Sequence, residues 1–321
     1  DCFVIYPINP LTLAKYRQAF TPSRAKDDPT DAEFAVDILL RHPDRFRPLK
    51  PQSMEMRALA TLVEQRRMMV DEKKRITNRL RTALKQYYPQ VLDWFDHIDT
   101  PIFCDFIRQW PTLMQVKRAR KNTLETFFHQ HNMRFAQVLA DRLDAIKTAT
   151  PLTMDDAVII PYRLQVQVLI EQLSVTLEGI KKFDQATESI ASRHPDFPLF
   201  DALPGAGPAL APRLLVAFGE QRDRYLNAAD LQKYAGIAPV TERSGIKHWV
   251  HWRWQCPTFL RQTFTEWAAQ TINKSFWAGQ YYYQQRAKGR SYQAAVRSLA
   301  FKWIRIIFRC WQTGKPYNES T

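Results

Sequence analysis

Cysteine is scarce in this sequence. The four residues are far apart and form no CxxC pair: Cys2, Cys104, Cys256 and Cys310. Zinc sites and the disulfide frameworks of small secreted domains both depend on closely spaced cysteines. We therefore expect neither a zinc site nor a disulfide framework, and a reducing compartment is the default.

Long apolar runs are missing as well. The stretch 300–311 is apolar, but Lys302, Arg305 and Arg309 interrupt it. A bilayer span needs about 20 consecutive apolar residues, so we expect no contact with a membrane. We also expect no signal peptide, because the first residues lack its pattern of charge and apolar length.

Acidic residues are too few to balance the basic ones. Lys and Arg number 46 against 32 Asp and Glu, which gives a formal charge of +14 over 321 residues. An excess of this size favours a polyanionic partner such as nucleic acid, although a plain basic soluble protein remains the alternative. The length suits two or three domains.

The first 50 residues read as part of an α/β domain. Apolar residues predict a strand over 3–6, and a helix follows over 11–20. A second helix is expected from Asp28, as the N-cap, to about Arg41.

Two long helices are predicted by apolar residues at spacings of three and four. One runs from Met54 to near Pro89 and is strongly basic, and the other runs from about Tyr162 to Ser192. They are suited to pairing as an antiparallel coiled coil. Several short helices should fill 93–158, where the basic stretch 117–121 is either a solvated face or a nucleic-acid contact.

The last third begins near Phe197 and carries a glycine-rich turn at 203–207. Gly205 and Gly207 would let backbone N–H groups approach a phosphate, as in a helix-hairpin-helix turn. An ordinary turn between helices is the alternative. Further helices are predicted over 258–269, 271–286 and 292–311.

Two acids near the N-terminus stand three residues apart at a helix start. Asp28 and Asp31 would present oxygen ligands to Mg²⁺. Acidic residues in a first helical turn also stabilise the helix itself, so a structural role is the alternative.

A serine lies among cations in the C-terminal third. Ser244 is flanked by Arg243 and Lys247, which suits a hydroxyl nucleophile that attacks a phosphodiester. An ordinary loop serine is the alternative. His248 and His251 are candidates for a base or a phosphate ligand, or else for residues on a helix face among tryptophans.

In their order and separation, five segments resemble the transposases of one insertion-sequence family, the IS one-ten family. The segments are Val4–Pro10, Lys26–Ala32, Leu203–Gly207, Tyr234–Pro239 and Arg243–Gly245. The resemblance covers the chain except for the variable stretch 93–158.

The resemblance implies a mainly α fold in three parts. Residues 1–50 would be the C-terminal part of a RuvC-like domain with DEDD acids and an α/β fold. Residues 51–196 would form the coiled coil with its helical insertion, and residues 197–321 the C-terminal transposase domain.

The resemblance also implies roles for individual residues. Asp28 and Asp31 look like the third and fourth DEDD acids, which bind Mg²⁺, and Ser244 looks like the serine that attacks DNA. Nucleic-acid contacts would come from Lys26, Gly205, Gly207, Arg243, Lys247 and Arg253.

The partners implied are DNA, a structured guide RNA and further copies of the chain. The compartment implied is the bacterial or archaeal cytoplasm, in association with the nucleoid. The first two DEDD acids would precede Asp1, so we expect a fragment or a truncated gene that binds metal poorly and forms little adduct.

Three functions stay open at this point. The leading hypothesis is a transposase that cuts and rejoins DNA through a serine. The second is a RuvC-like nuclease that uses metal alone and leaves Ser244 incidental. The third is a non-catalytic nucleic-acid-binding protein. A covalent DNA–protein linkage separates the first of these from the second.

Overall fold

The computed structural model describes residues 3–21, 27–133 and 135–319. The chain divides into two compact units, residues 1–53 and residues 54–321, and each is described by itself. The described part is mainly helical, as predicted, with a single two-stranded sheet. Within it, no helix combines the length and the apolar character that crossing a bilayer requires. The division into three domains stays a prediction.

The first unit is built on two helices, α1 (Pro10–Phe20) and α2 (Asp28–Arg41), followed by a 3₁₀ turn, η1 (Pro43–Arg45). Both predicted helices are confirmed. The helices pack through aromatic rings, with the ring centroids of Tyr16 and Phe34 6.0 Å apart. The Tyr16 hydroxyl also donates to Asp37 of α2 at 2.6 Å. The N-cap of α2 is Asp27, so the predicted cap at Asp28 was one residue too late.

The predicted strand over 3–6 is wrong for the described residues of that segment, which have no strand. A strand exists only where its backbone groups pair with another strand. Here the N–H of Leu49 donates to the carbonyl oxygen of Ile5 at 2.7 Å, and no ladder forms around that bond. Phe3 is 88% exposed. Residues 3–6 are apolar, as a strand would require, but no second strand pairs with them in the described chain.

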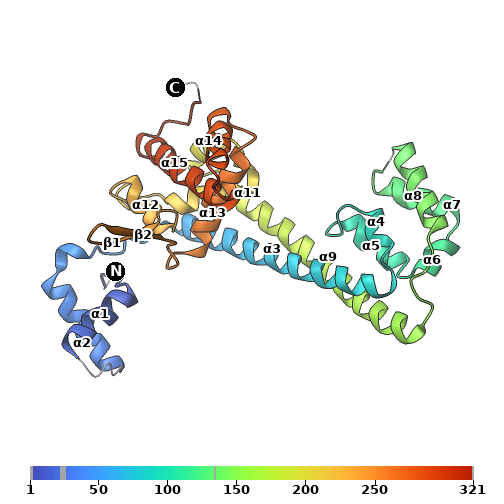
Figure 1. Cartoon of the computed structure of the whole chain (residues 1–321), viewed down its shortest axis with the longest axis horizontal. Helices are drawn as coiled ribbons and strands as arrows, with labels where there is room; N and C mark the ends of the chain where they lie inside the picture. Colours follow the sequence, from blue (N-terminus) through green and yellow to red (C-terminus); the bar gives the residue numbers. More distant parts are fainter. Residues whose placement is uncertain (1–2, 22–26, 134, 320–321) are drawn as a thin grey trace. The chain divides into compact units, whose positions relative to one another are not determined.

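Two long helices organise the second unit: α3 (Met54–Tyr87) and α9 (Asp156–Ala191). They lie side by side along much of their length (Figure 1). Arg66 is paired with Asp184, and Met69 packs against Gly179, so residue numbers rise along one helix as they fall along the other. The antiparallel pairing is therefore present, while coiled-coil geometry stays a prediction. Helix α9 begins six residues earlier than predicted.

Short helices lie at one end of this pair, and the prediction of several short helices over 93–158 is confirmed. They are α4 (Val91–Trp94), α5 (Pro101–Gln109), α6 (Leu113–Arg118), α7 (Lys121–Gln130) and α8 (Ala136–Thr148). Their aromatic residues pack around Leu80 of α3 and Leu169 of α9, both fully buried. The ring of Phe106 sits at the centre of this core, 5.0 Å from that of Phe95 and 5.7 Å from that of Phe127.

The other end of the pair carries the C-terminal core. Its helices are α10 (Phe197–Asp201), α11 (Gly207–Phe218), α12 (Ala228–Tyr234), α13 (Thr258–Thr271), α14 (Phe276–Ala287) and α15 (Tyr292–Thr313). Three fully buried tryptophans anchor it, and each indole N–H has an acceptor. Trp267 donates to the Pro204 carbonyl, Trp303 to the Thr271 hydroxyl and Trp311 to the Gly219 carbonyl. Helix α14 starts at Phe276, five residues later than predicted, after the Ser275 cap.

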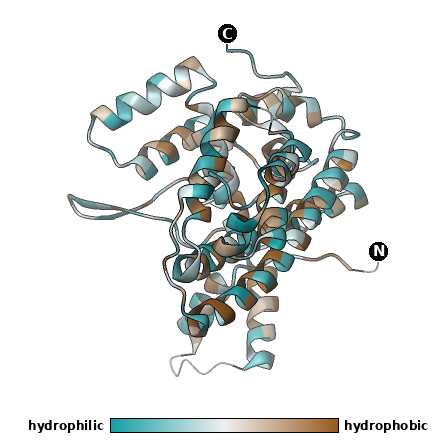
Figure 2. Cartoon of the chain, turned by 90° about the vertical axis from the view of Figure 1, so that its right-hand side faces the viewer, coloured by the Kyte–Doolittle hydropathy of each residue, from teal (hydrophilic) through white to brown (hydrophobic). Residues whose placement is uncertain are grey.

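A β-hairpin interrupts the C-terminal helices. Within the part of the chain that the structure describes, strands β1 (Val240–Ser244) and β2 (Lys247–His251) pair only with each other. The hairpin projects from the helices as a separate ribbon (Figure 2). Nine of its ten strand residues are exposed, Val240 being the exception. The sequence predicted a polar loop around Ser244, and that prediction was wrong in this respect.

The turn at 203–207 joins α10 to α11 and packs on α13. Gly205 has a φ of +71°, and a Cβ added there would lie 3.1 Å from backbone atoms of Gln270. Gly207 has a φ of +56°, with open space where its Cβ would be. The two glycines share the left-handed backbone that disfavours other residues, but only Gly205 is needed for close packing.

These glycines form a matched pair for a stability test. Gly207→Ala should lower the free energy of unfolding by about 1–2 kcal/mol, because the left-handed backbone conformation is unfavourable for a residue that has a Cβ. Gly205→Ala should cost about 1–3 kcal/mol more, because the backbone of Gln270 must also shift. Urea unfolding of both variants measures the difference. Equal losses would contradict the packing role of Gly205.

Candidate functional site

The acid pair predicted to bind metal lies in the first turn of α2, within the first unit. Asp28 is exposed, and the Asp31 carboxylate is paired with the Arg17 guanidinium of α1. The Arg17 side chain is only 10% exposed, so this ion pair forms in a sheltered place. It ties α1 to α2, which gives Asp31 a structural role whatever else it does.

The carboxylate oxygens of Asp28 and Asp31 suit Mg²⁺ if other groups supply the remaining ligands. Mg²⁺ is commonly held by one or two carboxylates together with waters and substrate phosphates. The two oxygens of Asp28 remain accessible, whereas Oδ1 of Asp31 accepts from Arg17. No group of three or more His, Cys, Asp or Glu suited to a metal occurs among the described residues. Within the described chain, waters and substrate phosphates would have to supply the remaining ligands. Lys26, predicted to bind nucleic acid, lies outside the described residues.

The register of the hairpin decides which side chains accompany Ser244. Ser244 lies opposite Lys247, Arg243 opposite His248 and Glu242 opposite Trp249. Directly opposed residues point to the same face of a sheet, and neighbours along a strand point to opposite faces. Ser244 therefore shares its face with Lys247, while Arg243 lies on the other face. The two cations predicted to flank the serine are separated by the pleat.

Ser244 ends β1 at the tip of the hairpin. Gly245 and Ile246 form the connection, Gly245 with a φ of +60°, as the first position of a type II′ turn requires. The Ser244 hydroxyl is exposed and has no hydrogen-bond partner among residues 3–21, 27–133 and 135–319. It is accessible to a large ligand but carries no activating partner within the described chain.

The two histidines lie on β2, so their alternative placement on a helix face is wrong. His248 shares the face of Arg243, opposite to that of Ser244. His251 shares the Ser244 face but pairs with Val240, four residues from Ser244, or about 13 Å along the strand. Its Nε2 lies 3.5 Å from Glu242. Neither imidazole is positioned to accept the Ser244 proton.

The base of the hairpin holds residues that the sequence did not single out. Trp252 directly follows β2 and lies against two arginines, Arg261 of α13 and Arg297 of α15. Arg253, predicted to bind nucleic acid, donates through Nε to the Ala238 carbonyl at 3.2 Å and so closes this base. The only sequence signal was the general mixing of aromatic and basic residues in the last third.

The basic row on α3 is largely neutralised. Between residues 66 and 81 it has seven cations, and four of them hydrogen-bond to acids: Arg66, Arg67, Lys73 and Arg75. The partner of Lys73 is Asp99, 2.7 Å away. The remaining three, Lys74, Arg79 and Arg81, are exposed and have no ion pair with any described residue. Counting charges along the sequence overstated what α3 offers to a polyanion.

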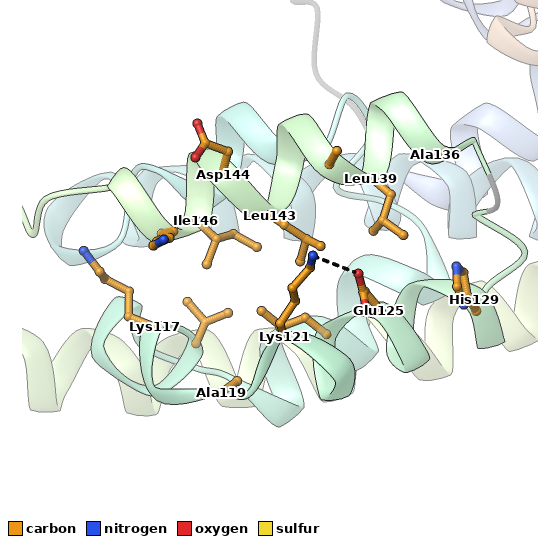
Figure 3. Close-up of a pocket in the computed structure, with 14 residues that line it drawn as sticks. Lys117, Ala119, Lys121, Glu125, His129, Ala136, Leu139, Leu143, Asp144 and Ile146 are labelled. Atoms are coloured by element: carbon orange, nitrogen blue, oxygen red, sulfur yellow. Dashed lines mark ion pairs between the residues drawn. The ribbon is translucent and has the colours of Figure 1, made fainter.

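One pocket lies far from the serine, between α6, α7 and α8 (Figure 3). Its volume is about 790 Å³, and its floor is apolar, with Leu139, Leu143 and Ile146 among the lining residues. Lys121 at the rim pairs with Glu125 at 3.7 Å. The lining also includes Lys117, Lys147 and Asp144, but none of the predicted site residues is among the residues that line this pocket.

The predicted catalytic and nucleic-acid-binding residues are thus distributed over both units. Asp28 and Asp31 lie in the first unit, and Ser244, Lys247, Arg243 and Arg253 lie in the second. Within the second unit, the hairpin brings Ser244 and Lys247 together.

Two family models match the chain. One, DEDD_Tnp_IS110, is described as a transposase and matches residues 2–89. The other is described as the transposase IS116/IS110/IS902 family and matches residues 198–284. The first range contains Asp28 and Asp31, and the second contains the glycine-rich turn and the whole hairpin. The short helices α4 to α8 lie outside both.

Several curated relatives are similar along most of the chain. A protein named for the IS117 mini-circle transposase of Streptomyces coelicolor is 29% identical over 320 residues, covering 98% of this chain and 77% of the relative. An uncharacterized 43.6 kDa protein of insertion element IS110, from the same species, is 25% identical, with 93% and 73% covered. An uncharacterized 44.8 kDa protein of IS116 from Streptomyces clavuligerus is 24% identical, with 88% and 70% covered.

Proposed function

This chain belongs to the IS110 family of transposases, which makes DNA its partner, and we propose that it cuts and rejoins DNA with Ser244 as the nucleophile. The observation that carries the proposal is the placement of Ser244. The hydroxyl is exposed at the tip of a projecting hairpin, with Lys247 on the same face. A nucleophile for a duplex must reach a phosphorus atom without a clash between protein and DNA, and a hairpin tip meets that requirement.

The proposed step is a transesterification. The Ser244 oxygen forms a bond to phosphorus, and the bond between phosphorus and a deoxyribose oxygen breaks. The serine loses its proton, the sugar oxygen gains one, and a phosphoserine-linked strand results. Attack by a hydroxyl of another strand reverses the step and frees the serine. The number of phosphodiester bonds is conserved, so rejoining needs no external energy source.

Lys247 would offset negative charge on the phosphate as the Ser244 oxygen approaches. Its position directly across the ladder supports this role. Asp28 and Asp31 are the proposed ligands of Mg²⁺, which supplies positive charge to a phosphate oxygen when bound. Because Arg17 already engages Asp31, Asp28 would be the more available ligand.

A guide RNA is part of the proposal. The formal charge of +14 supports binding to more than one polyanion. A metal-dependent nuclease that does not use Ser244 is the competing function, supported by the acid pair alone. Binding without catalysis is the third possibility, and the adduct test below separates all three.

Ser244→Ala should abolish the covalent adduct while DNA affinity changes less than about two-fold, because one exposed hydroxyl contributes little to binding. The protein as its gene encodes it, together with the RNA that purifies with it, is incubated with labelled DNA and Mg²⁺. Denaturing gels then measure the adduct, and filter binding measures affinity.

Thr241→Ala is the matched control, since Thr241 is an exposed hydroxyl on the same strand but on the opposite face. It should form adduct at the parental rate. Strand cutting by Ser244→Ala at the parental rate would overturn the nucleophile and favour the metal-dependent nuclease. Binding by the parent protein with neither cutting nor adduct would favour the non-catalytic function.

The two cations of the hairpin should differ in effect. Lys247→Ala should slow adduct formation by about 100-fold, the loss typical of a group that stabilises transition-state charge. Arg243→Ala should slow it by less than about five-fold, because its side chain lies on the opposite face. Single-turnover rates of the two variants give the comparison. Equal losses would show that the hairpin face does not decide which cation acts.

Self-association is also proposed. Helix α9 has an exposed apolar stripe, formed by Ile160, Leu164, Val168 and Val175. Joint replacement of Val168 and Val175 by Asp should lower the mass measured by light scattering, because apolar burial between copies would be lost. Leu226→Asp, at a residue 70% exposed and outside the helix, is the control. A monomeric parent protein, with and without RNA, would contradict the proposal.

A further inference from the structure

Three side chains from distant parts of the sequence converge at the base of the hairpin. Cζ of Arg297 lies 3.2 Å from the centroid of the Trp252 ring, and Cζ of Arg261 lies 5.6 Å from it. Helix α13 supplies Arg261, helix α15 supplies Arg297, and the segment after β2 supplies Trp252. This group, called here the Trp252 cluster, joins the hairpin to the C-terminal core.

The Trp252 cluster contains hydrogen-bond donors without acceptors. Nε1 of Trp252, Nη1 of Arg261 and Nε of Arg297 are each buried and have no acceptor among the described residues. Neither arginine forms an ion pair with any carboxylate in the described part of the chain. Arg213 of the same core also has one buried donor without an acceptor, Nη2, but its guanidinium does have a carboxylate partner, since it donates to Glu266 at 2.6 Å and to Thr263 at 3.1 Å.

Two unpaired cations in a sheltered place favour an anion. Burial lowers the pKa of the Arg297 guanidinium, and the charge of Arg261 lowers it further. Like charges repel most where water is excluded. Both arginines keep partial exposure, so an anion can reach their remaining N–H groups. An arginine fork matches the geometry of phosphate oxygens.

An aromatic platform lies beside the cluster. The Trp254 ring is 6.0 Å from that of Trp252, and Trp254 is 79% exposed. An exposed indole next to a phosphate-binding group is the arrangement that proteins use for unpaired nucleic acid, in which bases stack on aromatic rings. A base inside a duplex cannot stack on Trp254, because its faces are already covered.

We propose that the Trp252 cluster binds a backbone phosphate of an unpaired DNA segment, with an adjacent base stacked on Trp254. This proposal rests on the proposed function in one respect, namely that the bound polyanion is DNA. Trp252 follows His251, which lies about 13 Å along the strand from Ser244. The cluster therefore binds DNA several nucleotides from the reacting phosphate and positions the strand without taking part in the chemistry.

The test compares two double variants on equal terms. Arg261→Gln with Arg297→Gln removes the cluster cations. Arg305→Gln with Arg309→Gln, the control, removes two exposed arginines of α15, the helix that also carries Arg297. Fluorescence anisotropy with a 20-nucleotide oligothymidine is measured over a range of salt. The cluster variant should bind at least about ten-fold more weakly, and its log–log salt slope should be shallower by about 0.7 for each phosphate that it no longer neutralises. The control should change by less than about two-fold.

Trp254→Ala adds a readout that charge alone cannot produce. It should weaken binding to oligothymidine by about five-fold or more, the typical effect of removing one stacked base, and leave binding to a duplex of equal length unchanged. Equal losses on single strand and duplex would overturn the proposal. So would a cluster variant that is no weaker than its control.

Two further variants keep the test decisive. If the glutamine variant does not fold, as judged by circular dichroism, Arg261→Lys with Arg297→Lys takes its place. This variant keeps the charge but loses the fork, so it should bind at least about three-fold more weakly; parental affinity would overturn the proposal. Ser244→Ala should bind oligothymidine like the parent, so failure of the nucleophile and failure of the cluster are separate results.

Discussion

The antiparallel pairing of α3 with α9 is the constraint on which the second unit depends. The buried residues of α3 fall into two groups, and each group belongs to a different core. Met56, Leu59 and Val63 enter the C-terminal core, whereas Ile76, Leu80 and Leu84 enter the core of the short helices. Each core needs both long helices, because α9 closes the face that α3 leaves open. A slip between the two helices would therefore disturb both cores together.

The same pairing makes the charge of the chain a poor guide to its binding surface. Arg66 is paired with Asp184 across the two helices, and Lys73 is paired with Asp99 near the short helices. Ion pairs of this kind hold elements in place, and a paired cation is less available to a phosphate. The arginines with buried unpaired donors at the base of the hairpin, Arg261 of α13 and Arg297 of α15, lie on helices of the C-terminal core. The fold thus places available charge at the base of the hairpin that carries Ser244.

Periodicity predicted most helices well, because an apolar stripe at spacings of three and four matches the period of a helix and not that of a strand. Periodicity failed for strands, because a strand forms only where a second strand can pair with it. The apolar run at 3–6 needed a partner strand, and none exists in the described chain. The strands around Ser244 are exposed on both faces and show no alternation, so the sequence had no signal for them. Arg261 and Arg297 lie 36 residues apart, and only the packing of α13 against α15 reveals that they meet on Trp252.

The hairpin itself has little to stabilise it. An isolated two-stranded ribbon is marginally stable in water, and nine of the ten strand residues are exposed. Its orientation must therefore be set at its base, where Arg253 bonds to Ala238 and Trp252 lies against Arg297. A phosphate bound at the Trp252 cluster would reduce the repulsion between the two arginines and strengthen that base. Binding the strand and directing Ser244 would then be one event, since the same residues hold both.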